Sequence, residues 1–248
     1  MNLYGLIGFP LTHSFSKKYF TEKFEKENIK DSKYELFEIK EAGEILEVLK
    51  NNPDLRGLNV TIPHKENIMK YLTHFESEAN DIGAVNVIRV LPNGDLEGWN
   101  SDYYGFRESL ARFMGASVYN NHKALVLGTG GASKAIVRAL KDYNFEYTFV
   151  SRRKDINNSY LYEELNETIL SEYKLIINTS PLGMYPKTES FPEIPYQYLT
   201  PEHFLFDLVY NPEETTFMKK GAERGAKTKN GLEMLHLQAE KAWEIWNS

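Results

Sequence analysis

Short apolar runs alternate with amphipathic segments along the N-terminal part of the chain. The predicted elements are, in order, a strand over residues 3–7, a helix over 17–28, a strand over 34–39, a helix over 41–51 and a strand over 58–62. Pro63 should open a further helix, because a missing N–H is harmless at the first helical position. This alternation predicts a first α/β unit.

A hairpin should follow this unit's last strand. The apolar runs 85–91 and 96–99 flank the tetrapeptide Pro92-Asn93-Gly94-Asp95. Asn-Gly between two such runs is a strong signal for a tight turn between antiparallel strands. The hairpin therefore adds antiparallel strands to the first unit.

A second series of strands and helices follows Asp102. It comprises a helix through Phe106, strands over 124–127, 147–150, 175–178 and 204–209, and a last helix over about 232–246. A continuous apolar run such as 124–127 is typical of a central parallel strand, and the intervening helices predict right-handed crossovers. We therefore predict two α/β domains that flank a cleft. The first comprises residues 1–101 with the C-terminal helix 232–248, and the second comprises residues 102–231.

Composition narrows the class of partner. The 248 residues carry a formal net charge of -6, which gives no electrostatic reason to expect nucleic acid or an anionic membrane as partner. The chain has no cysteine, so disulfides and thiolate chemistry are excluded. No apolar run is long enough to span a bilayer, and the first ten residues do not resemble a secretory signal. We expect a cytoplasmic protein with a small-molecule partner.

The candidate phosphate-binding loop follows the strand 124–127. It reads Gly128-Thr129-Gly130-Gly131-Ala132-Ser133. Gly128 and Gly130 match the first two glycines of the dinucleotide-binding fingerprint, and Ser133 replaces the third. A glycine turn before a helix presents N–H groups and a partial positive charge to a pyrophosphate. The alternative is a tight turn without a ligand, but the strand–loop–helix context favours a Rossmann-type doubly wound parallel sheet.

The end of the next strand indicates which dinucleotide is bound. It reads Ser151-Arg152-Arg153-Lys154, where an NAD enzyme usually places Asp or Glu beside the ribose. Three cations would attract a 2′-phosphate, and Asp155 lies beyond them. NADP(H) is therefore the expected cofactor. The alternative is a solvated basic turn.

Polar residues of the first domain form a second candidate site. Ser14 and Ser16 stand at a helix start, where two hydroxyls could donate to a carboxylate, although N-capping alone would also explain a serine there. Alternation along the strand 58–62 directs Asn59 and Thr61 to one face. These four side chains could bind a small polar ligand.

Two charged residues accompany this site. Lys65 would lie in the first turn of the helix after Pro63, where the helix dipole disfavours a cation, so solubility alone explains the position poorly. Asp102 lies at a helix start and would by itself be interpreted as an N-cap. Asn86, at the start of a hairpin strand, adds a further polar group.

Together these residues resemble the shikimate dehydrogenase family, and the resemblance covers essentially the whole chain. It is carried by Gly8-Phe9-Pro10, Ser14-Phe15-Ser16, residues 57–65, Gly83-Ala84-Val85-Asn86, Asn100-Ser101-Asp102 with Gly105, and residues 128–132, 178–184, 207–212 and 231–238. The resemblance implies a reversible reduction of 3-dehydroshikimate to shikimate by NADPH, in the pathway to chorismate and the aromatic amino acids.

The resemblance also implies roles for individual residues. Lys65 and Asp102 match the family's catalytic pair, and Ser14 and Ser16 would hold the substrate carboxylate. Ring hydroxyls or the carbonyl region would contact Asn59, Thr61, Asn86 and Gln238, with Tyr210 near the nicotinamide and substrate. The cofactor-binding positions are Gly128, Thr129, Gly130, Gly131, Ala132, Ser151, Arg152, Arg153, Thr179 and Gly231.

Gln238 is expected on the inward face of the last helix, since it lies three residues after Leu235 and four before Ala242. A glutamine on a buried stripe needs hydrogen-bond partners. A bound ring hydroxyl would supply one. The alternative partners are a backbone carbonyl or water.

Several alternatives accompany this interpretation. A related branch of the family oxidises quinate, often with NAD, and Ser151-Arg152-Arg153 departs from the family's usual Asn-Arg-Thr. An NADP-binding regulator could share the fold but would have little need for both Lys65 and Asp102. No metal is expected, and the scattered His13, His64 and His236 are interpreted as structural. The chain could act as a monomer or a homodimer.

Overall fold

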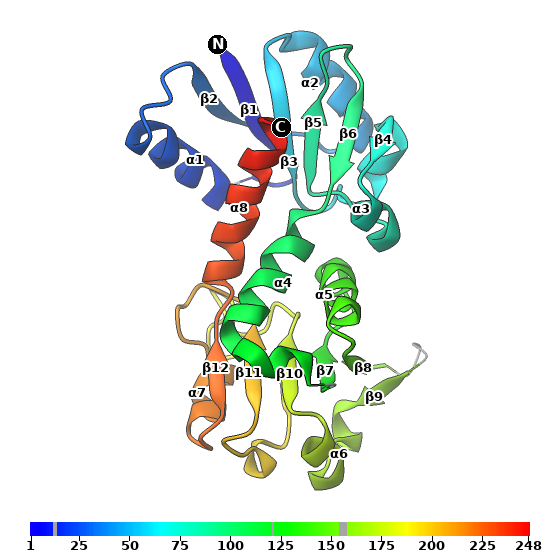
Figure 1. The fold of residues 1–248 in the computed structure, drawn as a ribbon, viewed down its shortest axis with the longest axis vertical. Coiled ribbons are helices and arrows are strands. Elements are labelled where there is room, and N and C mark those ends of the chain that lie inside the picture. Colours follow the sequence, from blue (N-terminus) through cyan, green and yellow to red (C-terminus); the bar gives the residue numbers. More distant parts are fainter. Residues whose placement is uncertain (12–13, 121, 154–157) are drawn as a thin grey trace. The chain divides into compact units, whose positions relative to one another are not determined.

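The computed structural model describes residues 1–11, 14–120, 122–153 and 158–248. The chain divides into two compact units (Figure 1). The first unit comprises Met1–Ser101 with Leu237–Ser248, and the second comprises Asp102–His236. In the described parts of the chain, no helix is long and apolar enough to cross a membrane. The predicted α/β class is confirmed, because each unit is a sheet covered by helices.

The first unit is built on a mixed sheet. Its strands, in spatial order, are β2 (Ser32–Glu38), β1 (Asn2–Gly8), β3 (Leu55–Val60), β5 (Val87–Val90), β6 (Leu96–Trp99) and β4 (His74–Phe75). β1 runs parallel to β2 and β3, whereas β5 is antiparallel to both β3 and β6. The predicted hairpin is confirmed: β5 and β6 flank Pro92–Asp95, and Gly94 adopts the left-handed φ of +90° that the turn requires.

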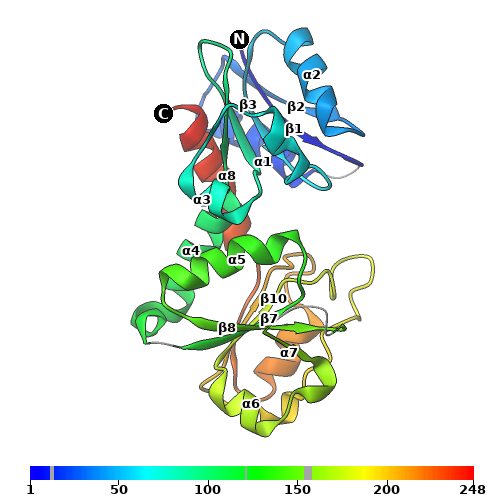
Figure 2. The ribbon, with the colours of Figure 1, turned by 90° about the vertical axis from the view of Figure 1, so that its right-hand side faces the viewer.

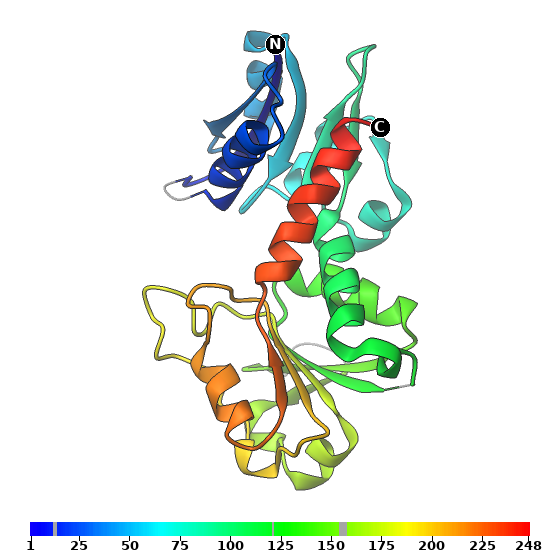
Figure 3. The same cartoon turned by 60° about the vertical axis from the view of Figure 1, so that its left-hand side comes forward.

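Helices cover both faces of this sheet. α1 (Phe15–Lys26) and the C-terminal part of α8 (Leu232–Trp246) lie on one face (Figure 3). The other face is covered by α2 (Ile45–Asn51), α3 (Ser77–Ile82) and the 3-10 helices Ala42–Glu44 and Asn67–Tyr71. Alternation along the strands supplies each layer with its own apolar core.

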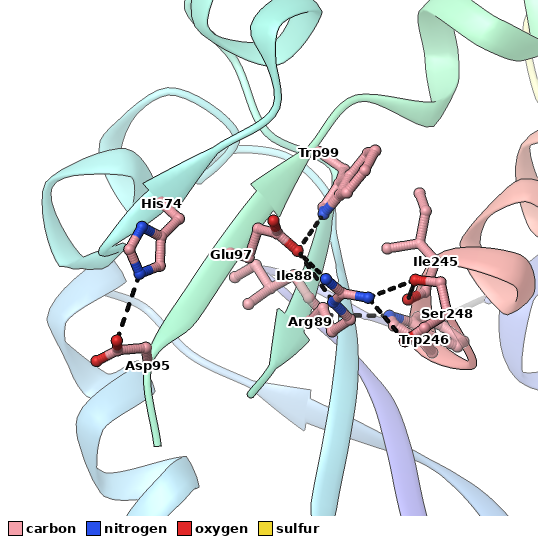
Figure 4. Close-up of polar contacts among 9 residues, drawn as sticks. All are labelled: His74, Ile88, Arg89, Asp95, Glu97, Trp99, Ile245, Trp246 and Ser248. Carbon is pink, nitrogen blue, oxygen red and sulfur yellow. Dashed lines mark hydrogen bonds and ion pairs between the residues drawn. The ribbon is translucent and has the colours of Figure 1, made fainter. Parts of the chain in front are cut away.

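The end of α8 is fastened to the sheet by an aromatic side chain and two polar contacts. Gly57 on β3 makes room for the Trp246 indole, because a Cβ there would lie 2.2 Å from that ring. Trp246 Nε1 donates to the carbonyl of Ile88 at 3.0 Å. Arg89 donates to the carbonyl of Ser248 at 2.9 Å and also pairs with Glu97 (Figure 4). These contacts hold a segment from the end of the chain against strands from its beginning.

The second unit is an all-parallel sheet. Its strands, in spatial order, are β12 (Lys227–Lys229), β11 (Phe204–Asp207), β10 (Leu175–Asn178), β7 (Lys123–Leu127), β8 (Glu146–Ser151) and β9 (Ser159–Leu161). From β9 to β12 this is the 3-2-1-4-5-6 order of the doubly wound dinucleotide-binding fold. The predicted Rossmann-type sheet is therefore confirmed. The strand order reverses between β7 and β10: from β7 the chain first adds strands on one side of the sheet and then on the other. Folds of this kind bind their ligands at that switch point.

Helices also cover both faces of the parallel sheet. α4 (Ser101–Met114) and α5 (Gly131–Asp142) pack on one face, and α6 (Glu167–Glu172) and α7 (Thr216–Ala222) lie on the other (Figure 2). The 3-10 helices Gly115–Tyr119, Tyr162–Glu164 and Tyr196–Tyr198 occupy connections. The central strands β7 and β10 are buried almost throughout, as their apolar runs predict.

One predicted helix does not form. After β3 the chain makes a turn, and only the short 3-10 helix Asn67–Tyr71 follows, so the prediction of a helix opened by Pro63 is wrong. The carbonyl of Lys65 accepts from the Val85 N–H at 2.8 Å, whereas an α-helix would need that carbonyl for Met69. A long-range backbone bond thus replaces the helical one.

Candidate active site

The predicted ligand residues of the first unit meet at one end of its sheet. Asn59 is near the end of β3, and the Thr61 N–H donates to the carbonyl of Ile7 at 2.9 Å. Asn86 precedes β5, and its carbonyl accepts from the Val60 N–H at 2.8 Å. The sheet therefore brings Asn59, Thr61 and Asn86 together from two segments of the chain.

The Asn86 side chain fixes the start of α4. It is 6% exposed, and its Oδ1 accepts from the Ser101 N–H at 2.7 Å. Its Nδ2 donates to Ser101 Oγ at 3.1 Å. Asn86 thereby determines where the chain turns into the helix whose second residue is Asp102. A role for Asn86 in substrate binding stays a prediction.

Lys65 lies in a turn rather than in a helix. The argument from the helix dipole is therefore wrong for this residue, because no helix surrounds it. The turn is held by the backbone bond from Val85 to Lys65 and by the buried His64, whose Nε2 lies 2.8 Å from the carbonyl oxygen of Ile39. Lys65 is half-buried, and the bonds to Val85 and Ile39 restrict the position of the turn that carries it.

Asp102 lies in the first turn of α4, where a carboxylate interacts favourably with the helix dipole. Ser101 is the last residue of the first compact unit, and Asp102 begins the second. Since Lys65 and Asp102 belong to different units, their action as a pair stays a prediction.

Ser14 and Ser16 have different partners. Ser14 is the N-cap of α1, and its hydroxyl oxygen accepts from the Lys17 N–H at 3.1 Å, so the capping alternative describes its contact here. Burial raises the pKa of the Tyr34 hydroxyl on β2, and a hydrogen bond with Ser16 opposes this shift. A hydroxyl that accepts at its oxygen can still donate its hydrogen, so carboxylate binding by Ser14 is chemically compatible with capping. His13 lies outside the described residues.

Gln238 is half-buried on α8. In the first unit, the apolar residues that this helix buries are Ala239, Ala242, Ile245 and Trp246. Leu235 is only half-buried, so Gln238 borders the buried stripe instead of lying at its centre. An amide at such a border can contact both the protein and a ligand.

The glycine loop of the second unit has the shape that a pyrophosphate needs. Gly128 has a φ of +102°, which favours glycine, and Gly130 caps α5. Within residues 1–11, 14–120, 122–153 and 158–248, the place where a Cβ of Gly130 or Gly131 would be has no atom within 4 Å, apart from the glycine itself, its chain neighbours and the adjoining helix backbone. Their backbone is therefore open to a ligand, and the loop fits a dinucleotide phosphate at a helix N-terminus.

The hydroxyl groups of Thr179 and Ser133 stabilise the backbone of this loop by hydrogen bonds. Thr179 Oγ1 donates to the carbonyl of Leu127 at 2.9 Å, which ties the end of β10 to the end of β7. Ser133 Oγ donates to the carbonyl of Gly130 at 2.7 Å. The serine at the third fingerprint position thus stabilises the turn that the two preceding glycines open.

The basic segment follows β8, next to the strand that leads into the glycine loop. Ser151 ends β8, and its hydroxyl oxygen accepts from the Arg153 N–H at 3.1 Å. Arg152 and Arg153 are exposed, so both guanidinium groups can reach an anion. Lys154 and Asp155 lie outside the described residues. Contact of Arg152 and Arg153 with the 2′-phosphate of NADP stays a prediction.

Sequence reasoning missed the role of Asn178 and Asp207, which end two neighbouring strands. Asp207 is fully buried; its Oδ1 accepts from Asn178 Nδ2 at 2.9 Å and from the Val209 N–H at 3.0 Å, and its Oδ2 accepts from Thr215 at 2.6 Å. Burial raises the pKa of Asp207 to about 6, against these hydrogen bonds, which lower it. The signal was a polar residue at the end of each apolar strand.

Tyr210 and Gly231 lie near this network. Tyr210 is 39% exposed, and burial of the rest of its side chain raises the pKa of its hydroxyl. A Cβ at Gly231 would lie 2.2 Å from the carbonyl oxygen of Leu208, so only glycine fits there. Close approach of two backbone segments explains this glycine, and its contact with a cofactor stays a prediction.

The fold and the loop together define a class of protein: a two-unit dinucleotide-binding α/β protein. Residues 6–88 match the family model described as the shikimate dehydrogenase substrate binding domain. A shikimate dehydrogenase (NADP(+)) of Clostridium beijerinckii is 39% identical over 99% of this chain and 92% of its own. The chain belongs to the shikimate dehydrogenase family, which confirms the resemblance.

Solved structures agree with this assignment. Shikimate 5-dehydrogenase of Listeria monocytogenes, in complex with shikimate and NAD, is 30% identical with a TM-score of 0.88, and covers 100% of this chain and 92% of its own. Shikimate 5-dehydrogenase of Thermus thermophilus, in complex with NADP(H) and shikimate, is 27% identical with a TM-score of 0.85. The match covers 99% of this chain and 93% of that chain. Both units thus have counterparts in shikimate dehydrogenases.

Proposed function

We propose that this protein is an NADP-dependent shikimate dehydrogenase that reversibly reduces 3-dehydroshikimate to shikimate, a step towards chorismate and the aromatic amino acids. The observation that carries the proposal is the 39% identity to an NADP-dependent shikimate dehydrogenase over 99% of this chain. The protein would act in the cytoplasm on a small-molecule substrate, as a monomer or a homodimer. Residues 1–101 with 232–248 would bind substrate, and residues 102–231 would bind NADP(H).

Charge develops on the substrate oxygen during such a reduction. Bound NADPH would supply the hydride. Lys65 would donate a proton to that oxygen or hold it with a charged hydrogen bond. A carboxylate nearby favours the ammonium form of a lysine, so Asp102 would keep Lys65 charged and oriented.

The polar side chains of the first unit would orient the substrate ring. Ser14 and Ser16 would hold its carboxylate, and Asn59, Thr61, Asn86 and Gln238 would contact its hydroxyls or carbonyl region. In support, the sheet of the first unit brings Asn59, Thr61 and Asn86 to one end. Tyr210 would lie near the nicotinamide and the substrate.

The residues of the second unit would hold the cofactor. Gly128, Thr129, Gly130, Gly131 and Ala132 would receive the pyrophosphate, in keeping with the open backbone of the loop. Ser151, Arg152 and Arg153 would receive the 2′-phosphate, and Thr179 and Gly231 would complete the binding surface.

One spectrophotometric assay tests the proposal. Purified protein with shikimate and NADP should produce NADPH, seen as a rise in near-ultraviolet absorbance, and kcat/KM should be higher with NADP than with NAD. Parallel reactions with quinate and with NAD test the related branch of the family. Absence of turnover with shikimate and either cofactor would refute the proposed activity.

A further inference from the structure

Tyr34 is a buried tyrosine whose ring is fixed by its neighbours. It lies on the edge strand β2, is 3% exposed, and pairs in register with Tyr4 on β1. Its ring stacks on that of Phe20 at a centroid distance of 4.8 Å and an interplanar angle of 14°, and the Trp246 ring is 6.3 Å away. Packing on two elements leaves the ring little freedom, so the position of its hydroxyl is determined.

The hydroxyl lies between two residues assigned to the substrate. It donates to Asn59 Oδ1 at 2.7 Å, and a hydrogen bond with Ser16 lowers its pKa against the effect of burial. Asn59 belongs to β3 and Ser16 to α1, so Tyr34 joins two elements of the site. Burial raises the pKa of Tyr34 far above its usual range, and the hydroxyl therefore keeps its proton and remains a donor.

The bond to Asn59 decides which end of that amide a ligand meets. Because Oδ1 is occupied by Tyr34, the amide cannot turn over without losing this bond. Among the described residues, its Nδ2 makes a long contact of 3.5 Å to the carbonyl of Asn86. Asn59 is therefore held with its N–H donors available to an oxygen of the ligand.

We infer that Tyr34 is a positioning residue of the substrate site, which orients the Asn59 amide so that it donates to a hydroxyl or carbonyl oxygen of the substrate. The inference rests on the proposed function, and it adds a residue that does not itself contact the substrate. Its effect should reach substrate binding only through Asn59.

The test is a double-mutant cycle with shikimate and NADP. Tyr34→Phe keeps the ring and should raise KM for shikimate about tenfold, the effect of one buried hydrogen bond, with kcat and KM for NADP unchanged. In an Asn59→Ala background the same change should have no further effect. If Asn59→Ala turns over too slowly for kinetics, calorimetric binding of shikimate to the same variants completes the cycle.

Tyr4→Phe is the matched control. Tyr4 is 2% exposed and lies opposite Tyr34 on the neighbouring strand, and its ring belongs to the same aromatic cluster. It should leave KM for shikimate unchanged. If Tyr34→Phe lowers only the melting temperature, or if it weakens the wild type and Asn59→Ala equally, Tyr34 is purely structural and the inference is overturned.

A second variant decides the matter should Tyr34→Phe fail to fold. Asn59→Asp keeps an acceptor for Tyr34 but removes the N–H donors, so it should weaken shikimate binding at least about tenfold at an unchanged melting temperature. Wild-type affinity in this variant would overturn the inference. Absence of shikimate turnover by the wild type would instead refute the proposed function, so the two failures are distinguishable.

Discussion

Single residues of this chain are placed by contacts that reach far along the sequence. Asn86 is bonded through its side chain to Ser101, and Lys65 through its carbonyl to Val85. These bonds hold the backbone of Lys65 and of Ser101, the residue before Asp102, and Lys65 and Asp102 are the residues that match the family's catalytic pair. Substitution of the Lys65 or the Asp102 side chain removes neither of these two bonds.

The first prediction concerns that pair. Lys65→Ala or Asp102→Asn should each lower kcat about 10²–10⁴-fold, the usual effect of losing a positioned proton donor or its partner. The double variant should be little slower than the slower single variant, because residues that act as a unit are not additive. Steady-state kinetics with shikimate and NADP measure this. Near-normal kcat in Lys65→Ala would exclude it as the proton donor.

The second prediction concerns cofactor choice. Arg152→Ala should weaken NADPH binding by about 1.5–3 kcal/mol, the value of a charged hydrogen bond, and should affect NAD far less. Calorimetric titration with each nucleotide measures both effects. Arg224→Ala, an exposed arginine of the same unit, is the control and should change neither. Equal losses for NADPH and NAD would mean that Arg152 does not contact the 2′-phosphate.

At the scale of elements, glycines determine which segments can approach each other. Gly57 admits the Trp246 indole to the surface of β3, and Gly231 admits the carbonyl of Leu208. The periodicity of α8 shows which of its residues are apolar but not which strand receives them. α8 packs against β3 because Gly57 has no side chain and therefore leaves room for the Trp246 indole.

The third prediction tests this docking. Gly57→Ala should lower the melting temperature, because its Cβ would lie 2.2 Å from the indole and overpacking costs about 1–3 kcal/mol. In a Trp246→Leu background, which removes the ring, the same change should cost much less. Thermal unfolding of the four proteins measures both. An equal loss in the two backgrounds would show that the indole is not the cause.

At the scale of the whole molecule, each compact unit has its own sheet and its own apolar cores. The stability of the second unit should vary with pH because of one buried carboxyl group, that of Asp207. Burial raises its pKa from 3.8 to about 6, so the folded state binds a proton more tightly than the unfolded state does. This contribution to stability is complete below the unfolded pKa and is lost as pH rises through the folded one.

The fourth prediction is a pH dependence of unfolding. Between about pH 4 and pH 7 the free energy of unfolding should lose on the order of 3 kcal/mol from this group, as a pKa near 6 implies. Asp207→Asn should remove this part of the pH dependence, whereas Asp54→Asn, at an exposed site, should keep it. Urea unfolding at several pH values measures it. An unchanged pH profile in Asp207→Asn would contradict the assignment.

The sequence by itself determined the local elements and the class of the second unit. The strand 175–178, the hairpin strand 96–99 and the helix 232–246 form as predicted, because apolar periodicity and turn propensity act within a few residues. The glycine loop could also be predicted from the sequence, since the φ preference of glycine and the start of a helix are local properties. β9 and β12 were not predicted, because each has only three residues and no apolar run.

Only the tertiary structure decided how the candidate site is supported. The turn at Lys65 replaces a helix because Val85 binds its carbonyl, and Asn59 is oriented by Tyr34, which lies 25 residues away along the chain. Asn178 and Asp207 meet across 29 residues because β10 and β11 are neighbours in register. Such partners depend on the order of the strands in the sheet, which local pattern does not encode, whereas the pattern does determine the strands themselves.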